Sequence, residues 1–282
     1  MLKQIKSIIR KNIIEPISIS AVLDTIKADK NLKEIWDSSY EQFPDFSEHF
    51  SQSVDSAEVE HRIRQLVVAE TAFVKEEIAK IVQERGRCEY ADIGDSDGSV
   101  RLLLKKYFSP QQLSTVGINL QAQAVEKMKK RGLSAICEDA LNLKAKKVQY
   151  DIASVFETLE HLPAPINFLT DIRDVVRHKL VVSVPFVRQS RVSLNYLTRR
   201  WDHAKRPTIE NVHIFELSPL DWSKIFLHTG WRVERERKLM MFPPNKLSRF
   251  ILQPYWLYTS FEGFWFVSLS KFDKFSSKYS VE

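Results

Sequence analysis

The stretch that decides the fold reads Glu89-Tyr90-Ala91-Asp92-Ile93-Gly94-Asp95-Ser96-Asp97-Gly98-Ser99. Its first half has the composition of a short strand, its second half is a turn of small and polar residues, and a helical pattern of apolar residues begins at Val100. Open α/β sheets build nucleotide sites from a strand, a glycine-containing turn and a helix, because glycine lets a ligand approach the backbone and the helix start offers unpaired N–H groups. The stretch therefore predicts an α/β fold with a ligand site at this turn, although an ordinary polar turn has a similar composition.

Beyond Arg87, short apolar runs alternate with helical patterns. Nearly continuous apolar strands that alternate with helices are typical of a doubly wound, mainly parallel sheet. The last two strands are expected to close this sheet as an antiparallel pair. The expected strands are 88–93, 114–118, 134–137, 150–156, 179–184, 231–237 and 264–269, and the expected helices are 100–107, 122–131, 165–176 and 221–229.

The residues before this alternation are helical in pattern. A helix is expected over 21–36, a looser polar stretch over 37–56, and a long helix over 57–84 whose apolar stripe is interrupted only by Glu70. We therefore predict an N-terminal helical cap over 1–85, followed by an α/β domain over 86–282 with an insertion around 187–212. A basic amphipathic pattern at the start of the cap predicts a helix that Pro16 ends or interrupts, and this helix can lie on an anionic membrane or dock on its own domain.

The composition is that of a soluble globular protein, with 282 residues of which 44% are hydrophobic and 28% are charged. A net charge of +6 permits an anionic partner without requiring one. Cys88 and Cys137 form no metal-binding or disulfide pattern, and both are expected to be buried free thiols in a reducing compartment. We expect no signal peptide and no transmembrane helix, and hence a cytoplasmic protein.

Five motifs follow the opening turn in a characteristic order, in the segments 116–119, 137–143, 150–162, 180–185 and 213–233. The most specific is Tyr150-Asp151-Ile152-Ala153-Ser154-Val155-Phe156-Glu157-Thr158-Leu159-Glu160-His161-Leu162. Together with the Asp-x-Gly-x-x-x-Gly turn, the series resembles the class I S-adenosylmethionine (SAM) methyltransferases, and in particular the group that includes the ubiquinone-biosynthesis O-methyltransferases. The resemblance covers residues 87 to 236 and implies a Rossmann-like methyltransferase fold with SAM as the cofactor.

The resemblance also implies which residues hold the cofactor. Those expected at its methionine end are Asp92, Gly94, Ser96 and Gly98. Those expected at the ribose, at the adenine and along the cleft are Asn119, then Asp139 and Ala140, and then Phe156 and Glu157. Two positions depart from the usual pattern, since Ser96 replaces a glycine and Asn119 replaces an acid that would bind the ribose with charge-assisted strength.

Glu157, Glu160 and His161 have helical spacing, which predicts that all three lie on one face of a helix. Together with His213 they resemble the metal site of small-RNA 2′-O-methyltransferases, in which a divalent ion lowers the pKa of a bound hydroxyl. Two alternatives remain open: His161 or His213, with Glu157 beside them, acts on the acceptor as a general base without a metal, or the group is structural.

The segment from 188 to 206 is rich in cations, with two aromatic residues among them. Such a composition suits a phosphate-bearing acceptor, and equally a solvated surface. The sequence thus leaves three hypotheses: an O-methyltransferase for a small molecule, glycan or lipid-linked intermediate; a metal-assisted RNA 2′-O-methyltransferase; and a degenerate methyltransferase used for binding. The oligomeric state stays open.

Overall fold

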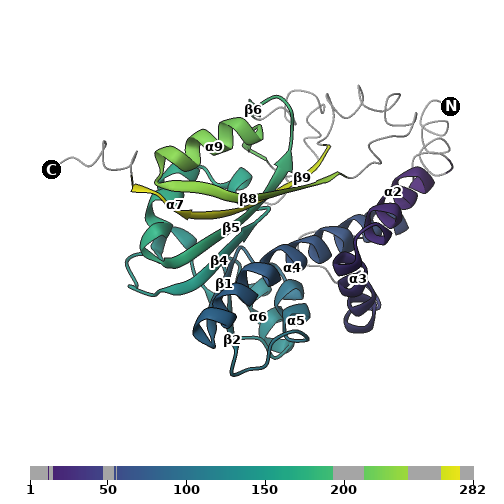
Figure 1. The fold of residues 1–282 in the computed structure, drawn as a ribbon, viewed down its shortest axis with the longest axis horizontal. Helices are drawn as coiled ribbons and strands as arrows, with labels where there is room; N and C mark the ends of the chain where they lie inside the picture. The colour runs from purple at the N-terminus through teal and green to yellow at the C-terminus, as the bar shows by residue number, and fades with distance from the viewer. Residues whose placement is uncertain are drawn as a thin grey trace.

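The computed structural model of the chain describes residues 15–46, 56–192, 213–240 and 262–273, together with residues 12 and 54. In these ranges a seven-stranded sheet forms the centre and helices cover both of its faces (Figure 1). The spatial order of the strands is β3-β2-β1-β4-β5-β9-β8. Their bounds are β1 Cys88–Ile93, β2 Leu113–Asn119, β3 Ala135–Cys137, β4 Tyr150–Phe156, β5 Val176–Phe186, β8 Trp231–Met240 and β9 Gly263–Lys271.

Strands β1 to β5 pair in parallel, and β9 pairs antiparallel with both β5 and β8. This arrangement confirms the predicted doubly wound, mainly parallel sheet and its antiparallel closing pair. A second, two-stranded sheet pairs β6 (Arg191–Val192) with β7 (Phe215–Glu216), so the two sides of the 193–212 segment are joined at its base.

The core has a layer on each face of the sheet, because successive side chains of a strand point to opposite faces. On β4, Ile152 packs among residues of α4 and α5, whereas Ala153 packs among residues of α7 and α9. Central strands covered on both faces are expected to be mainly apolar, and this explains their nearly continuous apolar runs. The helices after β1 are α5 Ser99–Leu104, α6 Ala122–Lys130, α7 Pro165–Asp171 and α9 Pro219–His228, and the short 3₁₀ helices are η2 Ala140–Asn142, η3 Leu159–His161 and η4 Ile172–Asp174.

The helix expected over 165–176 is shorter than predicted. It ends at Asp171, a 3₁₀ turn follows, and β5 begins at Val176. Val176 is the first residue of β5, and Val175 directly precedes it. Both are buried in the core, so the prediction placed them in the wrong element.

Three helices precede the sheet: α2 Glu15–Lys27, α3 Lys30–Gln42 and α4 Ala57–Arg85. Pro16 lies in the first turn of α2, where proline is tolerated, so among the described residues it opens a helix. The expectation of a loose stretch from residue 37 onward is wrong as far as Gln42, where α3 ends. Asp29 caps the start of this helix by accepting from the Asn31 and Leu32 N–H groups. The helix expected before Pro16 lies outside the described residues.

Helix α4 joins the cap to the sheet. Ser56 caps its start, and it ends at Gly86, whose φ of 79° closes the helix in the left-handed region. Phe73 packs on Phe266 of β9 at a ring distance of 5.8 Å, and Arg235 of β8 donates to Glu77 at 2.7 Å. Helix α4 therefore shares its core with the sheet. The division of the chain into two domains at residue 85 stays a prediction.

The two cysteines differ in their surroundings. Cys88 on β1 is buried, but Cys137 is exposed, which corrects the expectation of two buried thiols. Strand β3 is one of the two edge strands of the sheet and only three residues long, so its last residue receives little cover. Among the helices that the structure describes, none combines the length and the apolar character needed to cross a membrane.

Candidate functional site

The turn after β1 depends on two glycines in the left-handed region. Gly94 has a φ of 87° and Gly98 a φ of 80°. A Cβ atom on Gly94 would lie 2.3 Å from Oγ1 of Thr158, and one on Gly98 would lie 2.1 Å from Cδ1 of Leu133. Both glycines are therefore required by the packing of the turn itself, and Gly98 directly precedes the first turn of α5.

A buried ion pair holds this turn. Arg101 donates through Nε to Asp95 Oδ2 at 2.5 Å and through Nη1 to the Ser134 carbonyl at 2.8 Å, and both charged side chains are buried. Asp95 also accepts from the Gly98 N–H at 2.6 Å. Gly117 of β2 makes room for the guanidinium, because a Cβ there would lie 2.2 Å from Nη2. The sequence pattern did not reveal this pair, although it contained both Asp95 and Gly117.

Asp92 lies inside the end of β1. Its Oδ1 accepts from Oγ of Ser154 at 2.7 Å, and the Tyr90 hydroxyl lies 2.5 Å from the same Ser154 oxygen. Burial raises the pKa of Asp92 well above its usual value, and the neighbouring Asp95 carboxylate raises it further. The structure thus places Asp92 directly beneath the turn, in a hydrogen-bonded row that crosses from β1 to β4.

The two positions that depart from the expected pattern lie at the same turn. Ser96 is half-buried between the glycines. The side chain of Asn119 donates through Nδ2 to the Asp95 carbonyl at 3.0 Å and accepts from the Gln121 N–H at 2.7 Å, so it ties the end of β2 to the turn. An amide group can make four hydrogen bonds, so capacity remains for a ligand hydroxyl.

The remaining predicted cofactor residues follow the ends of β3 and β4. Asp139 is half-buried and accepts from the Leu141 N–H at 2.9 Å, which places Ala140 at the start of η2. Phe156 is half-buried at the end of β4. In a parallel sheet all strand ends of one kind meet at one edge, so these residues and the turn lie along the carboxyl edge, where open α/β sheets bind ligands.

Glu157 does not lie on a helix, which corrects the helical-face prediction. Its φ is 44°, and η3 begins only at Leu159. The strain is held by β5, since the Glu157 N–H donates to both the side-chain and the backbone oxygen of Ser183 at 3.1 Å. Its carboxyl Oε1 is buried without a partner among the described residues, and burial raises its pKa to about 8.

The helical cap contributes an acid to this edge. Glu70 of α4 is buried, and Ser183 donates to its Oε1 at 3.4 Å. Burial raises the pKa of Glu70, and the charges of Glu157 and Asp92 raise it further. The single polar interruption in the stripe of α4 therefore reaches the carboxyl edge of the sheet.

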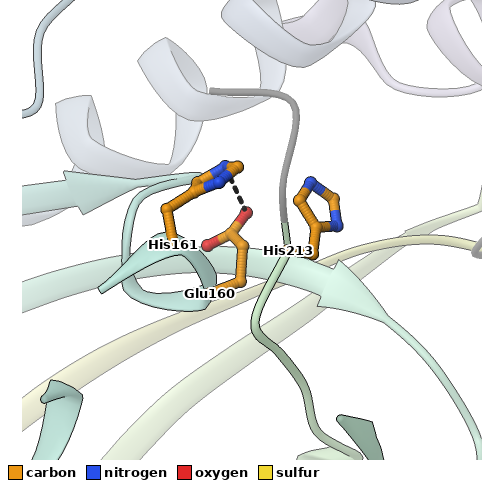
Figure 2. Close-up of side chains that lie close together, drawn as sticks. All are labelled: Glu160, His161 and His213. Carbon is orange, nitrogen blue, oxygen red and sulfur yellow. Dashed lines mark ion pairs between the residues drawn. The ribbon is translucent and has the colours of Figure 1, made fainter. Parts of the chain in front are cut away.

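Glu160, His161 and His213 come together beside this edge, as Figure 2 shows. One potential ligand atom from each residue lies within 4.8 Å of the others. The two imidazole rings pack edge to face, with their centroids 4.8 Å apart. Glu160 is fully buried, and its Oε1 lies 3.8 Å from Nε2 of His161, the ion pair drawn as a dashed line in Figure 2. Burial raises the pKa of Glu160, and the charge of Glu157 raises it further.

Backbone pairing brings these residues together from distant parts of the sequence. The Ile214 N–H donates to the Glu160 carbonyl at 2.7 Å, so the segment that carries His213 lies against η3. Glu157 is outside the group of three. One carboxylate and two imidazoles are a ligand set that zinc and other divalent transition metals accept, and the same groups can move protons without a metal.

His213 has a further partner that the sequence did not predict. Its Nδ1 lies 2.8 Å from Oε1 of Glu216, and Oε2 of Glu216 accepts from Nε of Arg191. Arg188 pairs with buried Glu262 at 2.8 Å. Two cations of the basic segment are thus bound to buried acids, and the segment from 193 to 206 lies outside the described residues.

Comparison with known families identifies the chain. The model of a family described as a methyltransferase domain matches residues 59–236, from within α4 to within β8. The chain belongs to this methyltransferase family. The match confirms the prediction that it is a methyltransferase enzyme, whereas the finer likeness to the ubiquinone-biosynthesis group stays a prediction. A comparison with curated proteins finds no match.

Solved structures share the fold of this methyltransferase at low identity. A protein assigned as a sarcosine dimethylglycine methyltransferase from Galdieria sulphuraria matches with 11% identity and a TM-score of 0.53, over 85% of this chain and 99% of the other. Magnesium protoporphyrin IX methyltransferase from Synechocystis PCC 6803, with bound S-adenosylhomocysteine (SAH), matches with 14% identity and a TM-score of 0.50, over 84% and 93%. The cyclase SpnF matches with 15% identity and a TM-score of 0.50, over 73% and 82%. At these identities the likeness shows the fold alone.

Proposed function

We propose that this methyltransferase transfers a methyl group from SAM to an oxygen of a small-molecule acceptor. The observation that carries the proposal is the grouping of Glu160, His161 and His213 within 4.8 Å beside the carboxyl edge that also carries the glycine turn. A hydroxyl acceptor must lose its proton as the new bond to carbon forms. Side chains of these kinds can accept such a proton, or can bind a metal ion that lowers the pKa of the hydroxyl.

The turn and the neighbouring strand ends fit an adenosyl cofactor. The turn has two left-handed glycines, and Asn119 and Asp139 beside it retain hydrogen-bonding capacity. The exposed apolar side chains of Leu120 and Leu141 follow these two residues in the chain. The relative from Synechocystis, described with bound SAH, supports the same choice. SAM would supply an electrophilic methyl group on a sulfonium sulfur. Asp92, Gly94, Ser96 and Gly98 would hold its methionine end, Asn119 the ribose, Asp139 and Ala140 the adenine, and Phe156 the wall of the cleft.

Two versions of the oxygen transfer differ in what takes the proton. In the first, His161 or His213 accepts the hydroxyl proton as a general base and the oxygen attacks the methyl carbon as the carbon–sulfur bond breaks. In the second, Glu160, His161 and His213 would hold a divalent ion, which would lower the pKa of the hydroxyl. The three-residue grouping supports both versions. RNA as the acceptor ranks lower, because the sequence has no recognisable RNA-binding module.

The test has two stages. Calorimetric titration with SAH establishes the cofactor, and failure of a folded wild type to bind it would contradict the proposal. Transfer of labelled methyl from SAM is then measured on panels of hydroxylated and amine-bearing small molecules, with and without a chelator. We expect O-methylated products that His213→Gln largely abolishes, while His178→Gln, a histidine on the opposite end of β5, keeps activity. Activity lost to a chelator and restored by a divalent ion selects the metal version, and exclusively N-methylated products refute oxygen transfer.

A further inference from the structure

The clearest unexplained feature near the proposed site is the side chain that holds His213. Glu216 is 3% exposed, and one of its oxygens lies 2.8 Å from Nδ1 of His213. The other oxygen accepts from Arg191, its partner across the β6–β7 pair.

The contact determines which imidazole nitrogen carries the proton. An ionised carboxylate only accepts hydrogen bonds, so a neutral imidazole facing it must place its proton on the nearer nitrogen. We propose that Glu216 is a positioning residue of the methyl-transfer site: it keeps the His213 proton on Nδ1, so that Nε2 carries the lone pair that accepts a proton or binds a cation. The inference rests on the proposed function for its catalytic meaning, but the tautomer itself can be measured independently.

Glu216 is suited to this role because its second oxygen is held by the guanidinium of Arg191, a permanent cation. Burial alone would raise its pKa, but the hydrogen bond from His213 and the charge of Arg191 together lower the pKa below its usual value. Glu160, on the other side of the grouping, has its pKa raised by burial and by Glu157. Of these two acids, Glu216 is the one that a guanidinium partner holds in place.

The local fold makes the contact rigid. Arg191 and Glu216 are paired residues of the two short strands that join the ends of the 193–212 segment, so the ion pair and the backbone pairing fix the same geometry. A carboxylate that orients a histidine in this way also stabilises the imidazolium that forms when the ring takes up a proton. The same contact therefore serves the general-base version and the metal version.

Nitrogen NMR of the imidazole groups tests the proposal on the whole chain. Spectra are recorded in a buffer alkaline enough to keep histidines neutral, and His213→Gln assigns the signal. We expect the wild type to carry the proton on Nδ1 and Glu216→Gln to lose this preference. Glu234→Gln, the same substitution on the outer part of β8, should leave the His213 signal unchanged. A wild type protonated on Nε2, or a signal unaffected by a folded Glu216→Gln variant, overturns the proposal.

Kinetics separate positioning from simple stability. We expect Glu216→Gln to lower kcat or metal affinity about 10- to 100-fold, as is typical of carboxylates that orient a functional histidine, with little change in SAH affinity. Unchanged kcat in the presence of a changed tautomer refutes the catalytic role. If the wild type fails to bind SAH, the proposed function fails while the NMR result still decides the tautomer. Should Glu216→Gln not fold, the wild-type spectrum and Arg191→Lys, which loosens the same carboxylate, decide the question.

Discussion

Replacing Arg101 with methionine should lower the free energy of unfolding by about 3–5 kcal/mol, because it leaves the Asp95 carboxylate buried without its cation. The guanidinium is fully buried, and its removal also leaves the Ser134 carbonyl without its 2.8 Å donor. Methionine fills much of the space of the arginine stem, so the loss reports on the charge and its hydrogen bonds. The effect matters for function because Asp95 fixes Gly98 in the turn that precedes α5.

A second substitution tells whether the uncompensated charge is the cause. In Asp95→Asn/Arg101→Met both charges are absent, so the cost should fall to about 1–2 kcal/mol, the size expected from one or two lost hydrogen bonds. The difference between the double variant and the summed single variants then gives a coupling free energy of a few kcal/mol. Arg131→Met is the matched control: Arg131 pairs with Asp97 at 2.9 Å, but it is partly exposed, and its loss should cost about 1 kcal/mol.

Urea denaturation followed by circular dichroism measures these differences, with equal m-values required for the comparison. The deficit of Arg101→Met should also shrink as the pH falls from 7 toward 4. Burial raises the pKa of Asp95, and the Arg101 charge that lowers it is gone, so the folded variant takes up a proton that the unfolded chain lacks. A single variant that loses less than about 1 kcal/mol, or a double variant as unstable as the single one, would refute the reasoning.

Three further outcomes follow from the same edge of the sheet. Burial raises the pKa of Glu157 from 4.5 to about 8, so between these pH values the folded protein binds a proton that the unfolded chain has released. As the pH rises through this range, the contribution of Glu157 should lower the free energy of unfolding by up to about 1.4 kcal/mol per pH unit. Glu157→Gln should lack this pH dependence, and parallel profiles of Tm against pH for the wild type and the variant would contradict the prediction. Gly98→Ala should lower the free energy of unfolding by about 1–3 kcal/mol more than Gly132→Ala. Both glycines have positive φ, but of the two only Gly98 has a neighbour, Leu133, that an added Cβ would overlap. Equal losses of stability in urea denaturation would show that this overlap is harmless. A thiol reagent should modify exposed Cys137 in the native protein, but Cys88, whose pKa burial raises to about 12, only after unfolding. If the cofactor lies over Asn119 and Asp139, SAH should slow the modification of Cys137. An unchanged rate counts against that placement.

Local patterns predicted the sheet well because its strands obey a simple physical demand. β4 was predicted with its observed bounds, since a central strand covered on both faces is mainly apolar and stands out in the sequence. The same rule misassigned residues 175 and 176, because an apolar residue at the end of a helix and one at the start of a buried strand look alike in sequence. Cys137 was misjudged for a related reason: composition marks a strand but does not say that the strand lies at the edge.

The arrangement of the candidate site could be predicted from the sequence only in part. Glu160, His161 and His213 come together as expected, but the helical spacing that suggested a common face did not hold for Glu157, whose backbone is fixed by Ser183 of the next strand. Glu216 and Arg101 were missed because their roles depend on partners 3 to 33 residues away that only the folded chain identifies. No spacing rule distinguishes such a charged residue from one on a solvated surface.

The departure at Asn119, which suggested a degenerate cofactor site, has a physical reason in the folded chain. The turn already carries the buried acids Asp92, Asp95 and Asp97, and burial together with the neighbouring Asp95 raises the pKa of Asp92. An aspartate at position 119 would add a further negative charge there and could not donate to the Asp95 carbonyl, whereas the asparagine amide donates at 3.0 Å and still accepts from Gln121. The asparagine thus stabilises the turn itself, which gives the departure at this position a structural reason that does not depend on loss of the cofactor.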